Sequence, residues 1–441
     1  MSAAPPRVGA PDHEANGVRM PLRIVRLANF ITPSSGGLRT ALRELGAGYR
    51  AAGHEPVLVV PGAHASDELT PQGRVITVPG PEVPGTGGYR VLTDRRRLAR
   101  LLDGLAPDRL EVSDRTTLRW TGEWARRARV PSVMVSHESA DGVLRTWGVP
   151  EAAARRAADG LNRRTARAYS RIVCTTEWAA REFVRIGARN VVRAPLGVDL
   201  DHFHPALRDP ALRDRHRDGA AVLLVMCSRL SPEKRPGRAL DALAELGRRG
   251  VVAALVVAGD GPLRPRLEAR AREEGLPATF LGHVADRGAL AALQAGADVV
   301  LAPGPAETFG LAALEALACG TPVVVSELSA LPAIVGPAGA TAADHGAAFA
   351  DAVEHLLSRP EPTRRATARA RAERYSWPEA VAAFLAAHDA LPVHDPSPVR
   401  GGLVVGGDVP ARDGRNGDAA SPEQGAHADG LPVGPAARAA R

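Results

Sequence analysis

Cysteines, long apolar runs and signal features are scarce in this sequence. It has only three cysteines, Cys174, Cys227 and Cys319, which lie far apart and lack the CxxC or CxxH spacing of a zinc site. Neither a disulfide framework nor a zinc site is expected, and a reducing cytoplasm fits. No run reaches the ~20 apolar residues that span a bilayer, and the N-terminus lacks the apolar core of a signal peptide. We therefore expect a cytoplasmic protein whose membrane contact is at most peripheral, on the inner face of the cell membrane.

Aromatic residues and excess charge are also sparse. Aromatics make up 4% of the chain, and the formal net charge is +7 over 441 residues. The apolar bulk is Ala, Leu and Val, which suits α/β layers better than an aromatic-rich β-sandwich. The small positive excess suits an anionic substrate or an anionic membrane surface, and by itself it does not indicate a nucleic-acid partner.

Short apolar strands alternate with helices in two blocks. The first block runs from "LRIVRLANF" to "RIVCTTEWAAREFVRIG", and the second runs from "AAVLLVMCSRL" to "TPVVVSE". Strands buried on both faces and alternating with helices indicate doubly wound parallel sheets. We therefore predict an α/β protein with two Rossmann-like domains facing a cleft.

Breaks in composition set the predicted boundaries. The prolines and glycine of "APLGVDLDHFHP" interrupt the alternation and mark a linker between the domains. The terminal segments lack hydrophobic periodicity and are expected to be disordered. In chain order we predict a tail at 1–20, a first domain at 21–194, a second domain at 195–375, a further helix at 376–391 and a tail at 392–441.

Three loops at strand ends of the second domain carry the candidate binding residues. "CSRLSPEKRP" holds Arg229 and Lys234, "AGDGP" holds Gly259 and Gly261, and "APGPAETFG" opens the helix that carries Glu315. Ligands of open α/β sheets bind where such loops meet, at the carboxyl ends of the strands. Two cations and a helix N-terminus on one rim would receive a diphosphate.

The two carboxylates of "ETFGLAALE" are too far apart to act on one bond. On a single helix Glu307 and Glu315 would be ~12 Å apart. Glycosidase pairs stand ~5–5.5 Å or ~6.5–9.5 Å apart, depending on the stereochemistry. The spacing therefore favours opposite ends of one extended ligand, with a phosphate at the helix start between them.

Several motifs in order resemble the retaining glycosyltransferases of family 4, which have the GT-B fold. They are "APLGVDLDHF", "SRLSPEKRP", "VVAGDGP", "FLGHV" and "PAETFGLAALEALACGTPVV", and the resemblance runs from Leu22 to about Leu391. Ser228 stands where many relatives have Gly, so a small residue is kept. The sequence around "SHESADG" most resembles actinobacterial GDP-mannose-dependent α-mannosyltransferases that act on lipid or glycolipid acceptors.

The resemblance implies a reaction and its catalytic residues. A hexose, with mannose from GDP-mannose favoured, would pass with retention to a hydroxyl acceptor without a metal or other cofactor. The first domain would hold the acceptor and the second the nucleotide sugar. The leaving diphosphate would help to take the acceptor proton, stabilised by nearby cations. The catalytic set implied is His137, Glu307, Arg229 and Lys234.

The same resemblance assigns binding roles. Glu307 would bind sugar hydroxyls, helped by backbone N–H groups that follow it, and Glu315 would bind the ribose. A glycine loop of the first domain would approach the phosphates, and the base would lie after the "FLG" strand. The implied binding residues are Gly36, Gly37, Gly259, Gly261, His283, Val284, Phe309, Gly310, Leu311 and Glu315.

Each assignment has a structural alternative. Arg229 and Lys234 could form ordinary salt bridges, His137 could be a satisfied structural histidine, and Gly36 and Gly37 could be turn glycines. The "DLD" of the linker resembles a metal-binding motif but has no third acid in view, so we interpret it as structural. The basic stretches "DRRRLARLL" and "RRAADGLNRRTARAYSR" fit either an anionic lipid surface or solvated helix faces.

Alternative functions remain open at this point. A UDP-sugar-dependent enzyme of the same fold is the closest one, and a catalytically silent nucleotide-binding or assembly protein is another. A dehydrogenase is disfavoured because no GxGxxG follows the first strand. The acceptor, the linkage and the oligomeric state are not indicated by the sequence.

Overall fold

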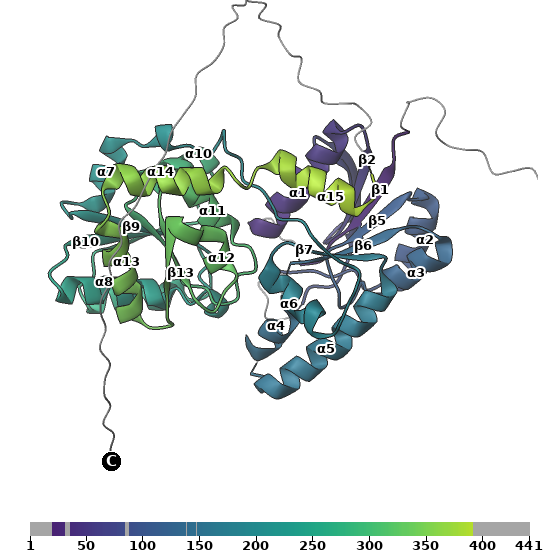
Figure 1. The fold of residues 1–441 in the computed structure, drawn as a ribbon, viewed down its shortest axis with the longest axis horizontal. Helices are drawn as coiled ribbons and strands as arrows, with labels where there is room; N and C mark the ends of the chain where they lie inside the picture. The colour runs from purple at the N-terminus through teal and green to yellow at the C-terminus, as the bar shows by residue number, and fades with distance from the viewer. Residues whose placement is uncertain (1–19, 31–35, 84–87, 138, 147, 391–441) are drawn as a thin grey trace, which may run out of the picture. The chain divides into compact units, whose positions relative to one another are not determined.

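The computed structural model describes residues 20–30, 36–83, 88–137, 139–146 and 148–390 (Figure 1). Apart from Met20, the predicted tails at 1–20 and 392–441 lie outside the described residues. Two separate β-sheets organise the described chain, one in each predicted domain. We call these parts the first lobe and the second lobe.

The first lobe contains an eight-stranded sheet in the order β3-β4-β2-β1-β5-β6-β7-β8. The chain starts in the middle of the sheet and moves outward on both sides, which is the doubly wound arrangement predicted. All described pairings are parallel except that of β3 with β4, an antiparallel edge hairpin that sequence patterning did not indicate. The strands are β1 Arg23–Leu27, β2 Glu55–Gly62, β3 Ser66–Thr70, β4 Gly73–Pro79, β5 Arg109–Val112, β6 Ser132–Ser136, β7 Arg171–Cys174 and β8 Val191–Arg193.

Two helices of the first lobe, α2 and α6, begin at residues whose side chains cap the first turn. The Asp94 carboxylate accepts the backbone N–H of Arg97 at the start of α2, and the Thr176 hydroxyl accepts that of Ala179 at the start of α6. Apolar residues of the helices bury against the sheet to form its core. The helices are α1 Gly37–Ala51, α2 Arg95–Leu105, α3 Trp120–Ala128, α4 Ala140–Thr146, α5 Glu151–Ala168 and α6 Glu177–Arg185.

The second lobe has a six-stranded, wholly parallel sheet in the order β11-β10-β9-β12-β13-β14. Every residue of β10 is buried, as expected for a strand covered by helices on both faces. The strands are β9 Val222–Cys227, β10 Ala253–Ala258, β11 Ala278–Gly282, β12 Val299–Ala302, β13 Val323–Ser326 and β14 Gly339–Ala342. The prediction of two Rossmann-like parallel-sheet lobes is confirmed.

Eight α-helices and three short 3-10 turns are described in the second lobe between the linker and residue 372. The helices are α7 Pro210–Arg217, α8 Gly237–Arg248, α9 Arg264–Glu273, α10 Arg287–Gly296, α11 Leu311–Ala318, α12 Leu331–Val335, α13 Gly346–Leu357 and α14 Glu361–Ala372. The 3-10 turns are η1 Pro205–Leu207, η2 Pro232–Lys234 and η3 Gly336–Ala338. The strand–loop–helix junctions of this lobe carry the predicted donor residues.

The final described helix, α15 Trp377–Ala387, returns to the first lobe. It packs on α1 so closely that a Cβ at Gly48 would lie 2.2 Å from Val381. Its last turn is held by side chains of the first sheet, since Arg109 and Arg171 donate to the carbonyl oxygens of His388 and Ala387 at 2.6 and 2.7 Å. This helix therefore joins the end of the second lobe to the first.

Candidate active site

The glycine-containing loop after β10 fits closely against the loop after β9 at the carboxyl edge of the second sheet. A Cβ at Gly259 would lie 1.8 Å from the Ser228 carbonyl oxygen, and one at Gly261 would lie 2.5 Å from that of Leu230. Both predicted glycines are therefore needed for a close backbone approach to the loop after β9. This backbone contact fixes the position of Arg229, independently of any ligand that Gly259 and Gly261 also contact.

The two predicted cations are both ion-paired in this structure. Arg229 pairs with Glu233 at 2.6 Å, and its other Nη donates to the Tyr89 hydroxyl at 3.2 Å. Lys234 pairs with Glu307, and both of these side chains are about a quarter exposed, at 24% and 23%. A diphosphate that binds these cations must therefore share them with the carboxylates or displace the carboxylates.

The loop between β12 and α11 turns sharply at Gly310. Gly310 has a φ of 71°, and a Cβ there would lie 2.3 Å from Leu331, so only glycine fits. No side chain caps the first turn of α11, which leaves backbone N–H groups available at the helix start. Phe309 and Leu311 are buried in the core, so either can contribute to a ligand only through its backbone.

Glu315 lies about one turn into α11, four residues after Leu311, as a half-buried carboxylate. In the described part of the chain its side-chain carboxylate forms no hydrogen bond or ion pair. Burial raises its pKa to about 7, and Asp199 adds to that rise while Arg287 and Arg43 oppose it. An unpartnered carboxylate of this kind can accept hydrogen bonds from ligand hydroxyls.

The structure places His137 directly after β6 and against the donor loop. Its Nε2 lies 3.2 Å from the Ser113 hydroxyl, and its carbonyl oxygen accepts the hydroxyl of Thr308, the neighbour of Glu307. Burial lowers the pKa of His137 to about 4, so the imidazole is neutral at pH 7. The nearby Arg115 also lowers this pKa, along with Arg26, and Glu111 opposes the change.

The predicted glycine loop, at Gly36 and Gly37, and the predicted nucleobase site, at His283 and Val284, lie in other loops than the cations. Gly36 and Gly37 do not have positive φ, and a Cβ at Gly37 would come no closer than 4.0 Å to its nearest neighbour, Leu311 at the start of α11. Local geometry does not require glycine at these two positions. His283 is exposed and Val284 half-buried, just after the bridge between Gly282 and Gly259.

Some neighbours of the site were missed at the sequence level. Glu233 stands four residues after Arg229 inside a noted motif, so a charge-pairing rule could have found it. Tyr89 and Thr308 contact residues of the site from loops. No local sequence pattern indicates these contacts. Arg287, whose charge acts on Glu315, lies on α10 and carries no motif either.

Neither a metal cluster nor a membrane span is evident in the described ranges. Among those residues no group of three or more His, Cys, Asp or Glu is arranged to hold a metal ion. Asp199 of the "DLD" segment instead accepts the backbone N–H of His202 at 3.0 Å, and it faces Arg287 at 3.9 Å. No helix within the described ranges is both long and apolar enough to cross a membrane.

The two parallel-sheet lobes, and the edge where the second gathers its cations and spaced carboxylates, place this protein among GT-B glycosyltransferases. Residues 36–199 match the glycosyl transferase 4-like domain, and residues 211–373 match the glycosyl transferases group 1 domain. The chain belongs to the retaining glycosyltransferases of family 4 and is a hexosyltransferase, which confirms the resemblance drawn from the motifs.

Curated relatives and solved structures agree with this assignment. The chain is 51% identical over 374 residues, 84% of its length and 97% of the relative's, to the GDP-mannose-dependent alpha-(1-6)-phosphatidylinositol dimannoside mannosyltransferase of Mycobacterium tuberculosis (strain ATCC 25177 / H37Ra). It is 29% identical over 323 residues, 72% of its length and 82% of the relative's, to the GDP-mannose-dependent alpha-mannosyltransferase of Mycolicibacterium smegmatis (strain ATCC 700084 / mc(2)155). Anabaena HepE in complex with UDP and glucose superposes with a TM-score of 0.66 at 19% identity, over 84% of this chain and all of that one, and shares the fold.

Proposed function

We propose that this protein transfers mannose from GDP-mannose, with retention, to a hydroxyl of a mannosylated inositol phospholipid. The observation that carries the proposal is the 51% identity over 97% of a relative whose name specifies that donor and that class of acceptor. The mannose of GDP-mannose is α-linked, and the relative's name specifies an α product. Retention of configuration therefore follows if the two proteins share their reaction.

The geometry of the second lobe supports a nucleotide-sugar donor. Lys234 pairs with Glu307, which precedes the uncapped start of α11, and Arg229 lies in the same loop as Lys234. A diphosphate bound there gains from both the cations and the free N–H groups. Glu307 precedes that helix and Glu315 lies about one turn into it, so the sugar and the ribose take opposite sides of the diphosphate. In this arrangement both carboxylates bind hydroxyls and neither acts as a nucleophile.

Charge stabilisation is the main catalytic contribution of these residues. Negative charge develops on the leaving diphosphate, next to Arg229 and Lys234. The leaving group takes the acceptor proton on the same face of the sugar, which retains the configuration. His137 is neutral at pH 7 because burial lowers its pKa, so it offers the sugar a hydrogen bond and no charge.

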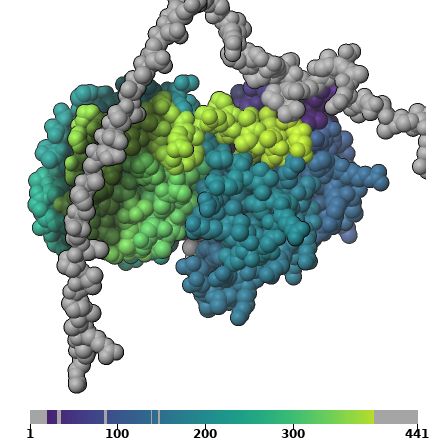
Figure 2. Space-filling view, viewed as in Figure 1, coloured from purple at the N-terminus to yellow at the C-terminus, as the bar shows by residue number. Residues whose placement is uncertain are grey.

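Unpaired arginines on the first lobe support a lipid acceptor and peripheral contact with an anionic bilayer. Exposed arginines occur on α2 and on α5, which lies on the face shown in Figure 2. Among the described residues none of them forms an ion pair, and each is worth ~1 kcal/mol near an anionic surface. They are Arg95, Arg96, Arg97 and Arg100 on α2, and Arg155, Arg156, Arg163, Arg164 and Arg167 on α5.

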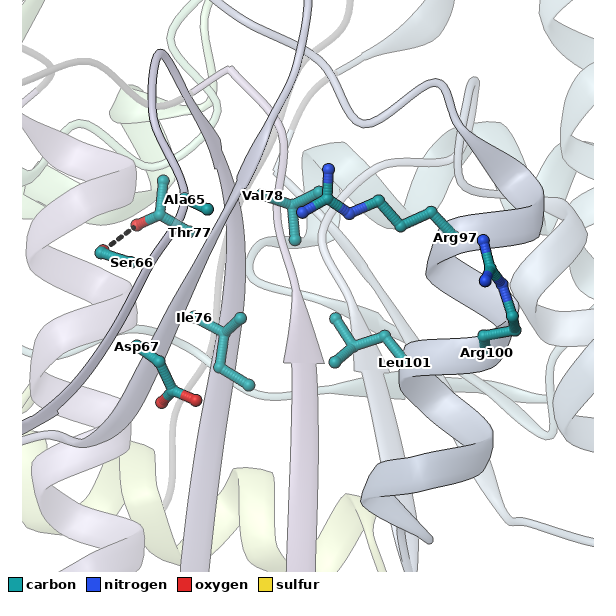
Figure 3. A pocket seen from close by; sticks show the side chains of 9 residues that line it. All are labelled: Ala65, Ser66, Asp67, Ile76, Thr77, Val78, Arg97, Arg100 and Leu101. Atoms are coloured by element: carbon teal, nitrogen blue, oxygen red, sulfur yellow. Dashed lines mark hydrogen bonds between the residues drawn. The ribbon is translucent and has the colours of Figure 1, made fainter.

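A pocket beside α2 combines this charge with an apolar surface. It has a volume of about 660 Å³ and lies between the β3–β4 hairpin and α2, with Ile76, Val78 and Leu101 among its lining residues (Figure 3). Arg97 and Arg100 extend from α2 along one side of it. An acyl chain with an anionic head group matches this combination of surfaces.

The proposal is tested with a panel of donors and acceptors. Purified protein is incubated with GDP-mannose, UDP-glucose or UDP-galactose and with vesicles that carry phosphatidylinositol or its mannosides, and the lipids are analysed by mass spectrometry. We expect one hexose to be added to a mannosylated lipid with GDP-mannose alone, and no addition by Glu307→Ala. Transfer from a UDP-sugar in preference to GDP-mannose would overturn the donor assignment.

A further inference from the structure

One buried ion pair lies beneath the segment that carries His137. Arg115, in the loop after β5, and Glu182, on α6, approach to 3.0 Å between Nη1 and Oε2. Their side chains are only 7% and 4% exposed. Two charges removed from water in this way must be matched by well-placed partners, since desolvation is costly.

Arg115 holds the segment on its N-terminal side. Its Nη2 donates to the hydroxyl of Ser136, the last residue of β6, at 2.9 Å. Its Nη1 also donates to the side-chain oxygen of Asn162, on α5, at 2.9 Å. The ring of Phe183 lies 5.4 Å below the guanidinium, which restricts it further.

Glu182 holds the segment on its C-terminal side. Its carboxylate accepts the backbone N–H groups of Ala140 and Asp141 at 3.0 and 2.8 Å, and the Ser139 hydroxyl at 3.1 Å. These groups form the start of α4, which is only seven residues long. A helix this short has little stability of its own, so its start depends on partners of this kind.

We propose that Arg115 and Glu182 are positioning residues of the transferase, which clamp the His137 segment from both sides and fix the imidazole for the donor sugar. The inference rests on the proposed role of His137. Neither side chain reaches substrate in this scheme, because both are buried behind the segment. Precise placement matters because a displacement of ~1 Å at a reacting centre can reduce the rate on the order of 100-fold.

Glu182→Gln tests the clamp with little change in volume. Oε1 accepts from Ser139 and Asp141, and Oε2 accepts from Ala140 and Arg115. Either orientation of the new amide therefore turns an NH₂ group towards existing donors. We expect kcat with GDP-mannose to fall ~10- to 100-fold while the Kd for GDP changes less than twofold.

A second measurement reads the position of His137 without catalysis. Burial keeps the pKa of its imidazole near 4, among the charges of Arg115, Arg26 and Glu111. Loosening the segment admits water, so in Glu182→Gln the pKa measured by NMR should rise towards the ordinary histidine value of ~6.5. An unchanged pKa would overturn the clamp even if the protein used a donor other than GDP-mannose.

Two further variants make the outcome decisive. Glu177→Gln, on the same helix but with its carboxylate 67% exposed, should behave as wild type. Ser139→Ala removes the hydroxyl that contacts Glu182, Asp141 and the backbone N–H of Gly142. It keeps the ion pair, so kcat should fall by a smaller factor in the same direction. A kcat within twofold of wild type in Glu182→Gln, or GDP affinity lost in step with kcat, would refute positioning. If Glu182→Gln does not fold, wild-type kcat and an unchanged His137 pKa in Ser139→Ala would refute it.

Discussion

Replacing Glu307 by glutamine should change GDP affinity and mannosyl transfer in opposite directions. Glu307 is paired with Lys234 in this structure, and a diphosphate has to compete for that ammonium group. GDP lacks the transferred mannose, so it gains from the freed cation and loses no contact with Glu307. GDP-mannose loses the charged carboxylate that accepts its mannose hydroxyls, and the amide of glutamine is a weaker acceptor, so transfer should be reduced to background.

The size of the GDP effect follows from the burial of the pair. Exposed ion pairs contribute ~0–1 kcal/mol, whereas breaking a buried pair costs ~3–5 kcal/mol. At 24% and 23% exposure the Lys234–Glu307 pair lies between these limits. We therefore take ~1–2 kcal/mol, which corresponds to a GDP Kd lowered ~5- to 30-fold.

The assay is calorimetric titration of GDP into both proteins, with lipid mannosylation measured in parallel. Glu245→Gln is the matched control, because Glu245 also pairs with an arginine of the second lobe, Arg249, at 2.7 Å. It should leave both quantities unchanged. Weaker GDP binding by Glu307→Gln, or transfer at the wild-type rate, would refute the placement of the diphosphate on Lys234.

Three further substitutions test individual parts of the structure. Gly259→Ala forces a Cβ to within 1.8 Å of a carbonyl oxygen. Thermal unfolding should therefore show that the free energy of unfolding falls by ~1–3 kcal/mol, and GDP should bind more weakly. The control Gly247→Ala, with open space around its Cβ, should leave GDP binding intact. The pKa of Glu315 is raised to about 7, above its unfolded value, so its burial costs stability as pH rises from ~4.5 to ~7. Glu315→Gln should therefore raise the Tm at pH 8 and not at pH 4.5, and an equal change at both values would contradict the shift. Glu111→Gln leaves Arg26, whose side chain is 1% exposed, without its charge partner. Denaturant unfolding should therefore show that the free energy of unfolding falls by ~3–5 kcal/mol. A decrease below ~1 kcal/mol would contradict the importance of this buried pair.

The fold was accessible from the sequence because it depends on local periodicity. Apolar strands such as β10, buried on both faces, stand out against the helices that alternate with them. The antiparallel hairpin of β3 and β4 was missed because β3 is short, polar and exposed, and so lacks that signal. The strand β3 forms because it pairs with β4 at the edge of the sheet, and its own residues carry no strand pattern.

The candidate site was accessible only where its residues stand close together in the chain. The spacing of Glu307 and Glu315 is a local fact, and it already argued against an acid/base pair. The Lys234–Glu307 pair joins residues 73 positions apart, and Arg115 and Glu182 are separated by 67. Long-range pairs of this kind are set by the packing of strands and helices, so no local pattern could indicate them. The raised pKa of Glu315 likewise follows from burial, which appears only in the folded chain.

The stereochemistry of transfer tests the proposed reaction most directly. GDP-mannose labelled with ¹³C at C1 is incubated with the protein and a mannosylated inositol phospholipid, and the C1–H1 coupling of the product is measured by NMR. An α-mannosyl product is expected, because the diphosphate leaves and the acceptor attacks on the same face, and neither Glu307 nor Glu315 becomes glycosylated. A β-mannosyl product, or a covalent mannosyl adduct on either glutamate, would contradict that mechanism.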